Sequence, residues 1–220
     1  MKYIDDPRSL EPLCRALSSS PWASVDTEAD SLHHYKEKLC LLQISVPSED
    51  FVIDTLEVKE AAPLFEILGA KLLILHGSDF DLRMLRRFYA FKAAGIFDTL
   101  TAAQLLGYER QGLSDLVERH FGVKLSKSAQ KADWSKRPLG EKLLTYAAND
   151  THYLHGLYEA MTRELKALNR FEWHRESCAR LLQSVEIEKE GDASEKPAWQ
   201  IKASKELGAG ELAVLKKLWP

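Results

Sequence analysis

The feature that most constrains the fold is a pair of apolar segments early in the chain. KLCLLQISV (residues 38–46) is an almost unbroken apolar run with one glutamine, and DFVIDT (50–55) follows it after the turn-like PSE. Two apolar runs separated by a short turn are typical of a β-hairpin, and an unbroken run indicates a strand buried on both faces. The sequence therefore predicts two buried, neighbouring strands.

Further strands and helices alternate around this hairpin. Additional strands are expected at 22–28, 71–77 and 95–99. Apolar residues at helical spacing, together with glycine stop signals, predict helices over 9–19, 58–69, 79–89, 99–107, 113–122, 140–167, 170–184 and 204–219. A hairpin followed by strand–helix units predicts an α/β fold: a mixed five-stranded sheet flanked by helices, with a helical C-terminal part.

Length and local composition indicate how the chain is divided. Its 220 residues are enough for one well-buried domain with a small appendage. A segment near the C-terminus, EIEKEGDASEKPA, is charged and poor in apolar residues, as linkers are. We therefore expect a main domain over residues 1–185, a linker over 186–198 and a helical segment over 199–220.

Charge and cysteine content exclude several classes of protein. The formal net charge of -3 gives no global signal for nucleic-acid binding, although a local basic patch remains compatible with it. Cys14, Cys40 and Cys178 are far apart and odd in number, which argues against a zinc site or a disulfide framework and favours a reducing, cytoplasmic location. No apolar run reaches the roughly 18 residues of a membrane span, and the N-terminus has no signal-peptide pattern.

Two acids close the first strand of this predicted sheet. In WASVDTEAD, Asp26 and Glu28 are two residues apart and project from the same face of the strand, with Thr27 on the other face. Such carboxylates repel each other and stay ionised together only when a cation lies between them. A strand that ends in solvated acids gives the same pattern, so this motif alone is a weak signal. Asp30 fits no further pattern and is assigned to a solvated turn.

Two later motifs supply more carboxylates. In HGSDFD, Asp79 or Asp81 begins a helix, where one of them can cap the helix and the other is left over. In YAANDTHYL, Tyr146 and Asp150 are four residues apart and face the same way on a helix, which also suits a packed tyrosine with an exposed acid. If that helix crosses the end of the sheet, four carboxylates converge. Ligation by oxygen alone suits Mg²⁺ or Mn²⁺, and such a set is typical of two-metal phosphoryl transfer.

In number, order and spacing these motifs resemble the DEDD superfamily of 3′–5′ exonucleases, and most closely ribonuclease D and the exosome-associated nuclear exonuclease. The family motifs are matched by DTE, LHGSDFD and YAANDTHYL. The flanking segments CLLQIS, DFVIDTL, IFDT and KADWSKRPL match as well, and the resemblance spans about residues 20–185. The resemblance places the second ligand at Asp81. The histidine branch has a His five positions before the last Asp, where this chain has Thr145, so Tyr146 assigns it to the tyrosine branch.

The resemblance implies an RNase H-like fold that hydrolyses RNA from a free, single-stranded 3′ end and releases nucleoside 5′-monophosphates, as in processing of tRNA 3′ trailers or other structured RNA. It implies two divalent ions, Mg²⁺ or Mn²⁺, held by Asp26, Glu28, Asp81 and Asp150. The Tyr146 hydroxyl would orient the attacking water. Residues 199–220 resemble the beginning of a helical HRDC domain, which in ribonuclease D follows the catalytic domain.

Candidate substrate contacts are concentrated in a basic loop. Residues 123–137 contain five basic side chains opposed only by Asp133: Lys124, Lys127, Lys131, Lys136 and Arg137. Such residues contact phosphates without regard to sequence. Trp134 can stack on a base or, more in keeping with its charged neighbours, anchor the loop to the core. His76 can touch substrate or be a buried, hydrogen-bonded residue. The predicted substrate-binding residues are Thr27, His76, Lys131, Trp134 and Arg137.

Two other functions fit the same sequence. A 3′–5′ exonuclease that acts on DNA would use the same chemistry on another substrate. A catalytically weak domain of the same fold would bind RNA or a protein partner, but such a domain usually lacks one of the acids and this chain keeps all four.

Overall fold

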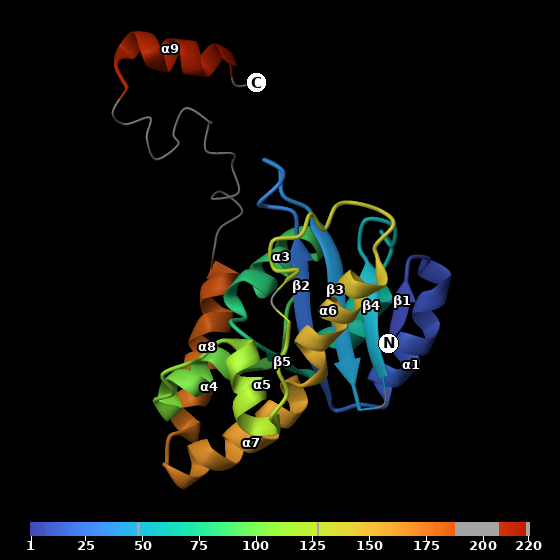
Figure 1. The fold of residues 1–220 in the computed structure, drawn as a ribbon, viewed down its shortest axis with the longest axis vertical. Coiled ribbons are helices and arrows are strands. Elements are labelled where there is room, and N and C mark those ends of the chain that lie inside the picture. Colours follow the sequence, from blue (N-terminus) through green and yellow to red (C-terminus); the bar gives the residue numbers. More distant parts are fainter. Residues whose placement is uncertain (48, 127, 188–206, 219–220) are drawn as a thin grey trace. The chain divides into compact units, whose positions relative to one another are not determined.

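The computed structural model describes residues 1–47, 49–126, 128–187 and 207–218 (Figure 1). In this part of the chain the centre is a mixed sheet of six strands in the order β1-β4-β3-β2-β5-β6. The strands are β1 (Lys2–Ile4), β2 (Trp22–Ala29), β3 (Leu39–Val46), β4 (Glu49–Asp54), β5 (Leu72–Leu75) and β6 (Gly95–Asp98). β3 is antiparallel to β2 and to β4, and the other neighbouring pairs are parallel.

The α/β class and the mixed sheet are as predicted, but the sheet has one strand more than the five expected. The additional strand is β1, which has three residues and lies at the edge of the sheet. So short a segment carries no alternating pattern of its own. It is ordered by parallel pairing with β4, in the register Lys2 to Phe51 and Ile4 to Ile53.

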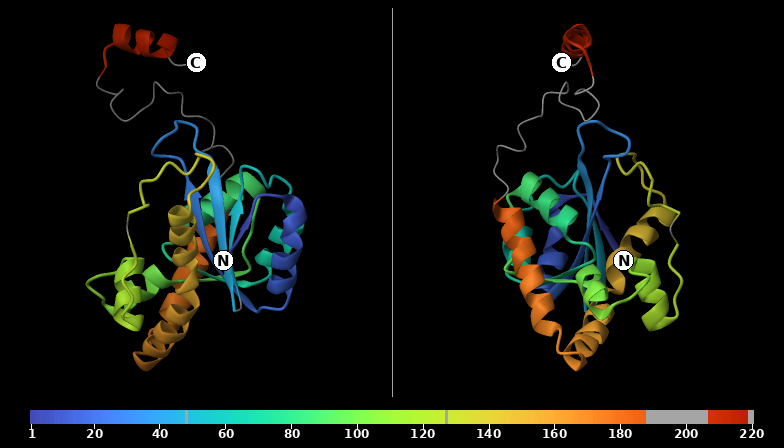
Figure 2. Two further views of the ribbon diagram at one scale, coloured as in Figure 1. Left: turned by 45° about the vertical axis from the view of Figure 1, so that its right-hand side comes forward. Right: turned by 90° about the vertical axis from the view of Figure 1, so that its left-hand side faces the viewer.

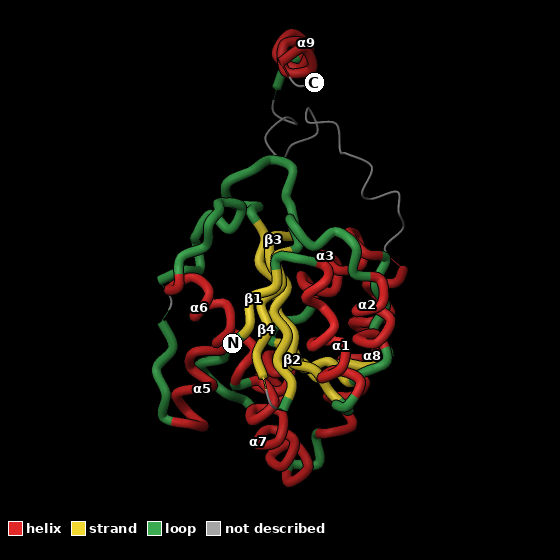
Figure 3. Tube along the Cα trace, turned by 90° about the vertical axis from the view of Figure 1, so that its right-hand side faces the viewer, coloured by secondary structure: helices red, strands yellow, loops and turns green. Residues whose placement is uncertain are grey.

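Helices cover both faces of the sheet. The helices of the described residues are α1 (Glu11–Ser18), α2 (Ala62–Gly69), α3 (Asp79–Tyr89), α4 (Thr99–Leu106), α5 (Leu113–Phe121), α6 (Glu141–His152), α7 (Leu154–Ala167) and α8 (Phe171–Ile187), together with α9 (Ala209–Leu218) in the C-terminal unit. Figure 3 shows the sheet edge-on, with α5 and α6 on one side and α1, α2 and α3 on the other. The right-hand view of Figure 2 shows the same layers from the opposite direction.

The helix predicted over residues 140–167 is two helices, which corrects that prediction. α6 ends at His152 and α7 begins at Leu154, with Tyr153 between them. The two helices pack on different partners. Ala147 and Ala148 of α6 lie in an apolar cluster on β3 and β4, whereas α7 joins a second cluster with β5, β6, α4 and α5. No proline or glycine marks the break, so only the packing reveals it.

The packing of α6 positions the site described below. Ala147 is fully buried and Ala148 nearly so, and small side chains let a helix approach a sheet closely. β3 is buried along its whole length, as the apolar run predicts. Thr151 fixes the end of α6, because its hydroxyl is 2.7 Å from the Ser45 hydroxyl on β3.

The chain divides into two compact units, Met1–Leu182 and Gln183–Pro220. The predicted linker over 186–198 lies outside the described residues except for its first two positions, which belong to α8. α9 is the described helix of the C-terminal segment. The domain limits therefore stay predictions. Among the described helices, none is long and apolar enough to cross a bilayer.

Candidate active site

Three carboxylates from two elements meet on one face of the sheet. Asp26 and Glu28 project from the same face of β2, and Asp150 lies near the end of α6, which crosses that face (Figure 1). One oxygen from each of the three lies within 4.8 Å of the others. The pleat of β2 brings the first two together. Asp150 joins them only because α6 packs across the sheet.

The fourth acid comes from the turn after β5. Asp81 lies in the first turn of α3 and is buried, and its Oδ1 accepts a hydrogen bond of 2.6 Å from the Thr27 hydroxyl. Asp79 instead forms an ion pair of 2.8 Å with Arg83 on the exposed side of the helix. The structure therefore distinguishes two acids that helix capping alone leaves equivalent and of which the resemblance chose Asp81. The Thr27 hydroxyl supports Asp81, and the predicted contact of Thr27 with substrate stays a prediction.

Asp98, at the end of β6, holds the turn that carries Asp81. Its carboxylate accepts hydrogen bonds from the backbone N–H of Gly77 at 3.0 Å and of Ser78 at 2.9 Å, and from the Ser78 hydroxyl at 2.8 Å. It also caps α4 through the N–H of Leu100. The sequence analysis assigned no role to Asp98, although the segment IFDT that contains it was among the flanking matches. It is the group that fixes the entry to α3.

Tyr146 lies on α6 one turn before Asp150, beside the three clustered carboxylates. Its ring packs against Trp134 with ring centroids 6.0 Å apart. Burial and the nearby charges of Asp150, Glu28 and Asp26 raise the pKa of its hydroxyl. A phenol whose pKa is raised stays protonated at neutral pH. Tyr146 can therefore donate a hydrogen bond to a water or phosphate oxygen without first losing its proton.

Burial disfavours the negative charge of all four acids, and the other acids add to this effect at Asp26 and Glu28. Burial and then the charges of Asp81, Asp150 and Glu28 raise the pKa of Asp26 well above its ordinary value. Burial, followed by the charges of Asp150 and Asp81, raises the pKa of Glu28 to about 9. Burial raises the pKa of Asp150 to about 7. Burial also raises the pKa of Asp81 to about 7, although the hydrogen bond from Thr27 opposes that shift.

This donor set fits divalent cations. All four acids are oxygen donors, and Asp26, Glu28 and Asp150 each offer an oxygen within 4.8 Å of the other two. Among the described residues no buried cationic side chain neutralises them. Hard cations such as Mg²⁺ and Mn²⁺ prefer such ligands. Beside Tyr146 and Asp150 an open pocket of about 390 Å³ gives access to the site; its lining residues are Leu125, Ser126, Ser128, Glu141, Lys142, Thr145, Tyr146, Asn149 and Asp150.

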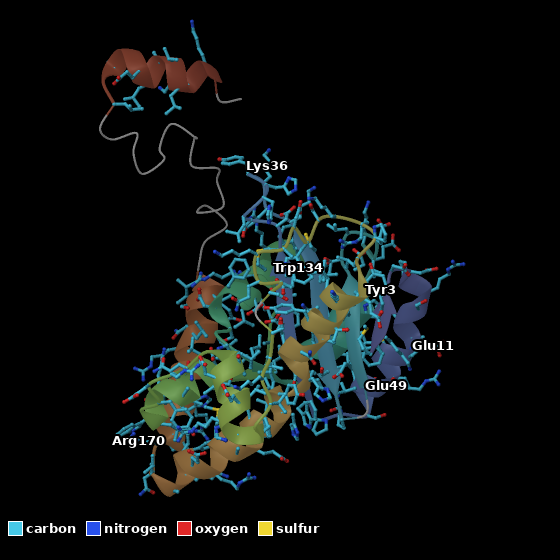
Figure 4. The ribbon with its side chains drawn as sticks, viewed as in Figure 1. Tyr3, Glu11, Lys36, Glu49, Trp134 and Arg170 are labelled. Carbon is cyan, nitrogen blue, oxygen red and sulfur yellow. The ribbon has the colours of Figure 1, made fainter. Side chains whose placement is uncertain are left out.

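Trp134 is buried, with 1% of its surface exposed, and packs in the apolar cluster beneath α6 (labelled in Figure 4). It anchors the loop before α6, which corrects its predicted contact with substrate and agrees with the alternative interpretation of the sequence. A side chain this deeply buried presents no face on which a base can stack. Its position instead supports the ring of Tyr146.

Arg137 is also engaged within the protein. Its Nε and Nη2 donate to the Asp54 carboxylate, its Nη1 donates to the carbonyl oxygens of Trp134 and Lys136, and its Nη2 also donates to that of Cys40. These five contacts use all the N–H donors that a guanidinium has. The prediction that Arg137 contacts RNA phosphates is corrected, because no donor is left for them. Arg137 ties the loop to β3 and β4.

The remaining predicted substrate residues differ in accessibility. His76 is mostly buried and its Nδ1 lies 3.0 Å from the Thr99 hydroxyl, as the alternative interpretation of the sequence has it. Lys131 is exposed, and its backbone carbonyl oxygen contacts the His33 Nε2 at 3.1 Å. Of the five predicted substrate contacts, Lys131 keeps an exposed charged side chain. Its contact with RNA stays a prediction.

Asp30 is not in a solvated turn, which corrects the interpretation of that residue. It is fully buried, and its Oδ1 accepts a hydrogen bond of 2.6 Å from the backbone N–H of Lys38. Its backbone oxygen accepts hydrogen bonds from the N–H groups of His33 and His34. Asp30 therefore organises the loop between β2 and β3, next to Glu28.

Comparison with known proteins agrees with this geometry. The family model described as 3′-5′ exonuclease matches residues 1–166. The chain belongs to the 3′–5′ exonuclease family. This match covers β2, α3 and α6, so it includes each of the acids and Tyr146.

Relatives within this family confirm the resemblance to ribonuclease D and the exosome-associated enzyme. Exosome complex component 10 of Mus musculus is 40% identical over 145 residues, which are 64% of this chain and 16% of that protein. The structure of Escherichia coli RNase D, described as an exoribonuclease involved in structured RNA processing, superposes with a TM-score of 0.80 at 27% identity, covering 98% of this chain and 58% of that one. Brucella melitensis NrnC with bound Mg²⁺ gives a TM-score of 0.72 at 26% identity, over 88% of this chain and 94% of that one.

The curated relatives are much longer than this chain. It spans 21% of RRP6-like 2 and 27% of RRP6-like 1 of Arabidopsis thaliana. What the family membership establishes for this chain is therefore the exonuclease domain.

Proposed function

We propose that this chain is a metal-dependent 3′–5′ exoribonuclease that releases nucleoside 5′-monophosphates from a free 3′ end. The observation that carries the proposal is the cluster of Asp26, Glu28 and Asp150, with an oxygen of each within 4.8 Å of the others. These half-buried carboxylates have raised pKa values and are costly to keep ionised, and divalent cations offset this cost.

Asp26, Glu28, Asp81 and Asp150 would hold two divalent ions, Mg²⁺ or Mn²⁺. Bound there, such ions activate a water and neutralise charge on the phosphate. The protein's own contribution is position. Asp81 is held by Thr27, and Tyr146 would donate a hydrogen bond that orients the water for in-line attack on phosphorus. The water oxygen would bond to phosphorus and give up a proton to solvent, while the bond to the leaving 3′ oxygen breaks and that oxygen takes up a proton from solvent.

We propose RNA with a single-stranded 3′ end as substrate, such as a tRNA trailer or another structured precursor. Support comes from the relatives: one is an exosome component and another is described as acting in structured RNA processing. DNA is the competing substrate. A cytoplasmic location is likewise a proposal, supported by three free cysteines, Cys14, Cys40 and Cys178.

The test is digestion of 5′-labelled RNA and DNA of the same sequence with Mg²⁺ or Mn²⁺. We expect a ladder of shortened RNAs, nucleoside 5′-monophosphate as product, and no reaction with excess EDTA or with a 3′ phosphate. Asp81→Asn should abolish activity. Asp79→Asn is the matched control, because Asp79 lies two positions away and pairs with Arg83 outside the site. Activity of the wild type in EDTA would overturn the proposal, and faster digestion of DNA would change the substrate.

A further inference from the structure

Gln43 is a buried polar residue in the middle of β3 that makes no hydrogen bond through its side chain. It is fully buried, and neither its Nε2 nor its Oε1 has a partner in the described part of the chain. A buried amide without partners costs the free energy of its lost hydration, so native proteins rarely keep one. An apolar residue of similar size would be the more stable choice in a strand otherwise so apolar.

The position of Gln43 relates it directly to a proposed metal ligand. On the antiparallel pair β2 and β3, Gln43 is the cross-strand partner of Asp26. Residues directly opposite each other in such a pair project from the same face, with their Cβ atoms about 4.5–5.5 Å apart. The Gln43 and Asp26 side chains therefore project side by side on the face that α6 covers, and the Gln43 side chain is long enough to reach the carboxylate.

The next cross-strand pair on the same face contains one polar group with a partner and one without. Ser45 is opposite Ser24 in the same register, and the Ser45 hydroxyl lies 2.7 Å from the Thr151 hydroxyl of α6. Ser24 is buried and its Oγ, like the amide of Gln43, has no partner within the described residues. On this face Ser45 is therefore held by α6, whereas Gln43, two positions before it on β3 and directly opposite Asp26, has no partner among the described residues.

We propose that Gln43 is a positioning residue for Asp26, whose amide N–H donates a hydrogen bond to the Asp26 carboxylate when a divalent ion is bound. This inference rests on the proposed function, because it requires a cation on that carboxylate. Carboxylates that ligate metals are commonly held in orientation by such donors, and loss of one typically costs 10- to 100-fold in metal affinity. Gln43 lowers the stability of the metal-free protein and strengthens its metal binding.

The test is Gln43→Met, which removes the amide and keeps a long, unbranched side chain. Thermal unfolding in EDTA measures the metal-free protein, and calorimetric titration with Mn²⁺ measures metal binding. We expect a midpoint in EDTA equal to or above that of the wild type, together with an affinity for Mn²⁺ lower by about tenfold. A residue that merely packs the core would give the reverse: a lower midpoint and unchanged affinity.

Ser24→Ala is the matched control. It also removes a buried polar atom without a partner, two positions before Asp26 on the same face, and should raise or preserve the midpoint while leaving Mn²⁺ affinity unchanged. Unchanged affinity in Gln43→Met, or a lower midpoint in EDTA, overturns the role of Gln43. If the wild type itself binds no Mn²⁺, the proposed function fails instead.

A measurement on the wild type covers the case in which Gln43→Met does not fold. The chain has six glutamines, at positions 43, 104, 111, 130, 183 and 200, so selective ¹⁵N labelling of their side-chain amides gives a simple spectrum. Because Gln43 is fully buried, its two side-chain amide protons should exchange with solvent more slowly than those of the other glutamines. Its proton resonances should shift on addition of Mg²⁺. The absence of any shift in a protein that binds Mg²⁺ overturns the proposal.

Discussion

Thr27 and Asp81 are joined by a hydrogen bond of 2.6 Å between hydroxyl and carboxylate, although 54 positions separate them in the chain. Thr27 lies between Asp26 and Glu28 and projects from the opposite face of β2. One strand therefore carries two acids of the site on one face and the support of a third acid on the other. A shift of this strand by one residue would exchange the two faces.

The bond from Thr27 can be removed almost isosterically. We expect Thr27→Val to weaken Mn²⁺ binding by about tenfold or more, since a hydrogen bond to a charged group contributes about 1.5–3 kcal/mol. Without the donor the pKa of Asp81 rises further, because this bond opposes the effect of burial. Calorimetry measures the affinity. Thr27→Ser keeps the hydroxyl and should restore binding; equal loss in both variants would show that the methyl group matters instead.

The Tyr146 hydroxyl is predicted to act on the rate of reaction and not on substrate affinity. In Tyr146→Phe the ring keeps its contact with Trp134, so the midpoint of unfolding should stay the same. The kcat should fall by about 100-fold or more, the usual effect of losing a positioned hydrogen-bond donor in an active site, with KM little changed. Steady-state kinetics on a short RNA separate the two constants. Tyr158→Phe, at a tyrosine that packs on Phe97, serves as control and should be fully active.

Arg137 and Lys131 lie in the same loop and should respond oppositely to substitution. Arg137→Met leaves the buried Asp54 carboxylate without its cation, which we expect to destabilise the fold by about 3–5 kcal/mol. Lys131→Ala should leave the unfolding free energy unchanged. If Lys131 contacts phosphate, this variant should bind RNA more weakly. The slope of log K against the logarithm of salt concentration should become shallower by about one.

Chemical denaturation together with RNA binding at several salt concentrations distinguishes the two residues. A stable Arg137→Met variant with a reduced salt dependence would return Arg137 to the set of RNA contacts.

The metal-free protein should lose stability as pH rises. Glu28, Asp81 and Asp150 have pKa values raised to about 9, about 7 and about 7 in the folded state. The folded protein therefore binds protons more tightly than the unfolded chain, whose carboxyl pKa values are about 4. Relative to the ionised state, the protonated acids stabilise the fold fully below about pH 4. This stabilisation is lost as the pH rises through about 7, where Asp81 and Asp150 ionise, and through about 9, where Glu28 ionises.

Thermal unfolding in EDTA between about pH 5 and 9 measures this loss, and the curve of Asp150→Asn should be flatter than that of the wild type. Divalent ions bind the ionised carboxylates, so the rise in midpoint that Mn²⁺ produces should grow with pH. A metal-free midpoint that is independent of pH would contradict the raised pKa values.

Much of the fold and of the site could be read from local sequence. Apolar runs identified the strands from β2 to β6, and the pairing of Asp26 with Glu28 on one face follows from the pleat alone. The helical spacing of Tyr146 and Asp150 placed them on one side of α6. These features depend on residues close together in the chain, where the geometry of one strand or helix fixes which side chains share a face.

The tertiary structure decided what depends on partners distant in the chain. β1 exists because β4 pairs with it, and the long predicted helix divides because α6 and α7 pack in different clusters. Asp79 and Asp81 both suit the first turn of α3, and the structure shows the different partners that they take: Thr27 for Asp81 and Arg83 for Asp79. Arg137 looked like a phosphate ligand until Asp54 and three carbonyl oxygens used its donors. A sequence shows which polar groups a side chain carries, but the free energy of burial and hydrogen bonding decides which of them remain available to a ligand.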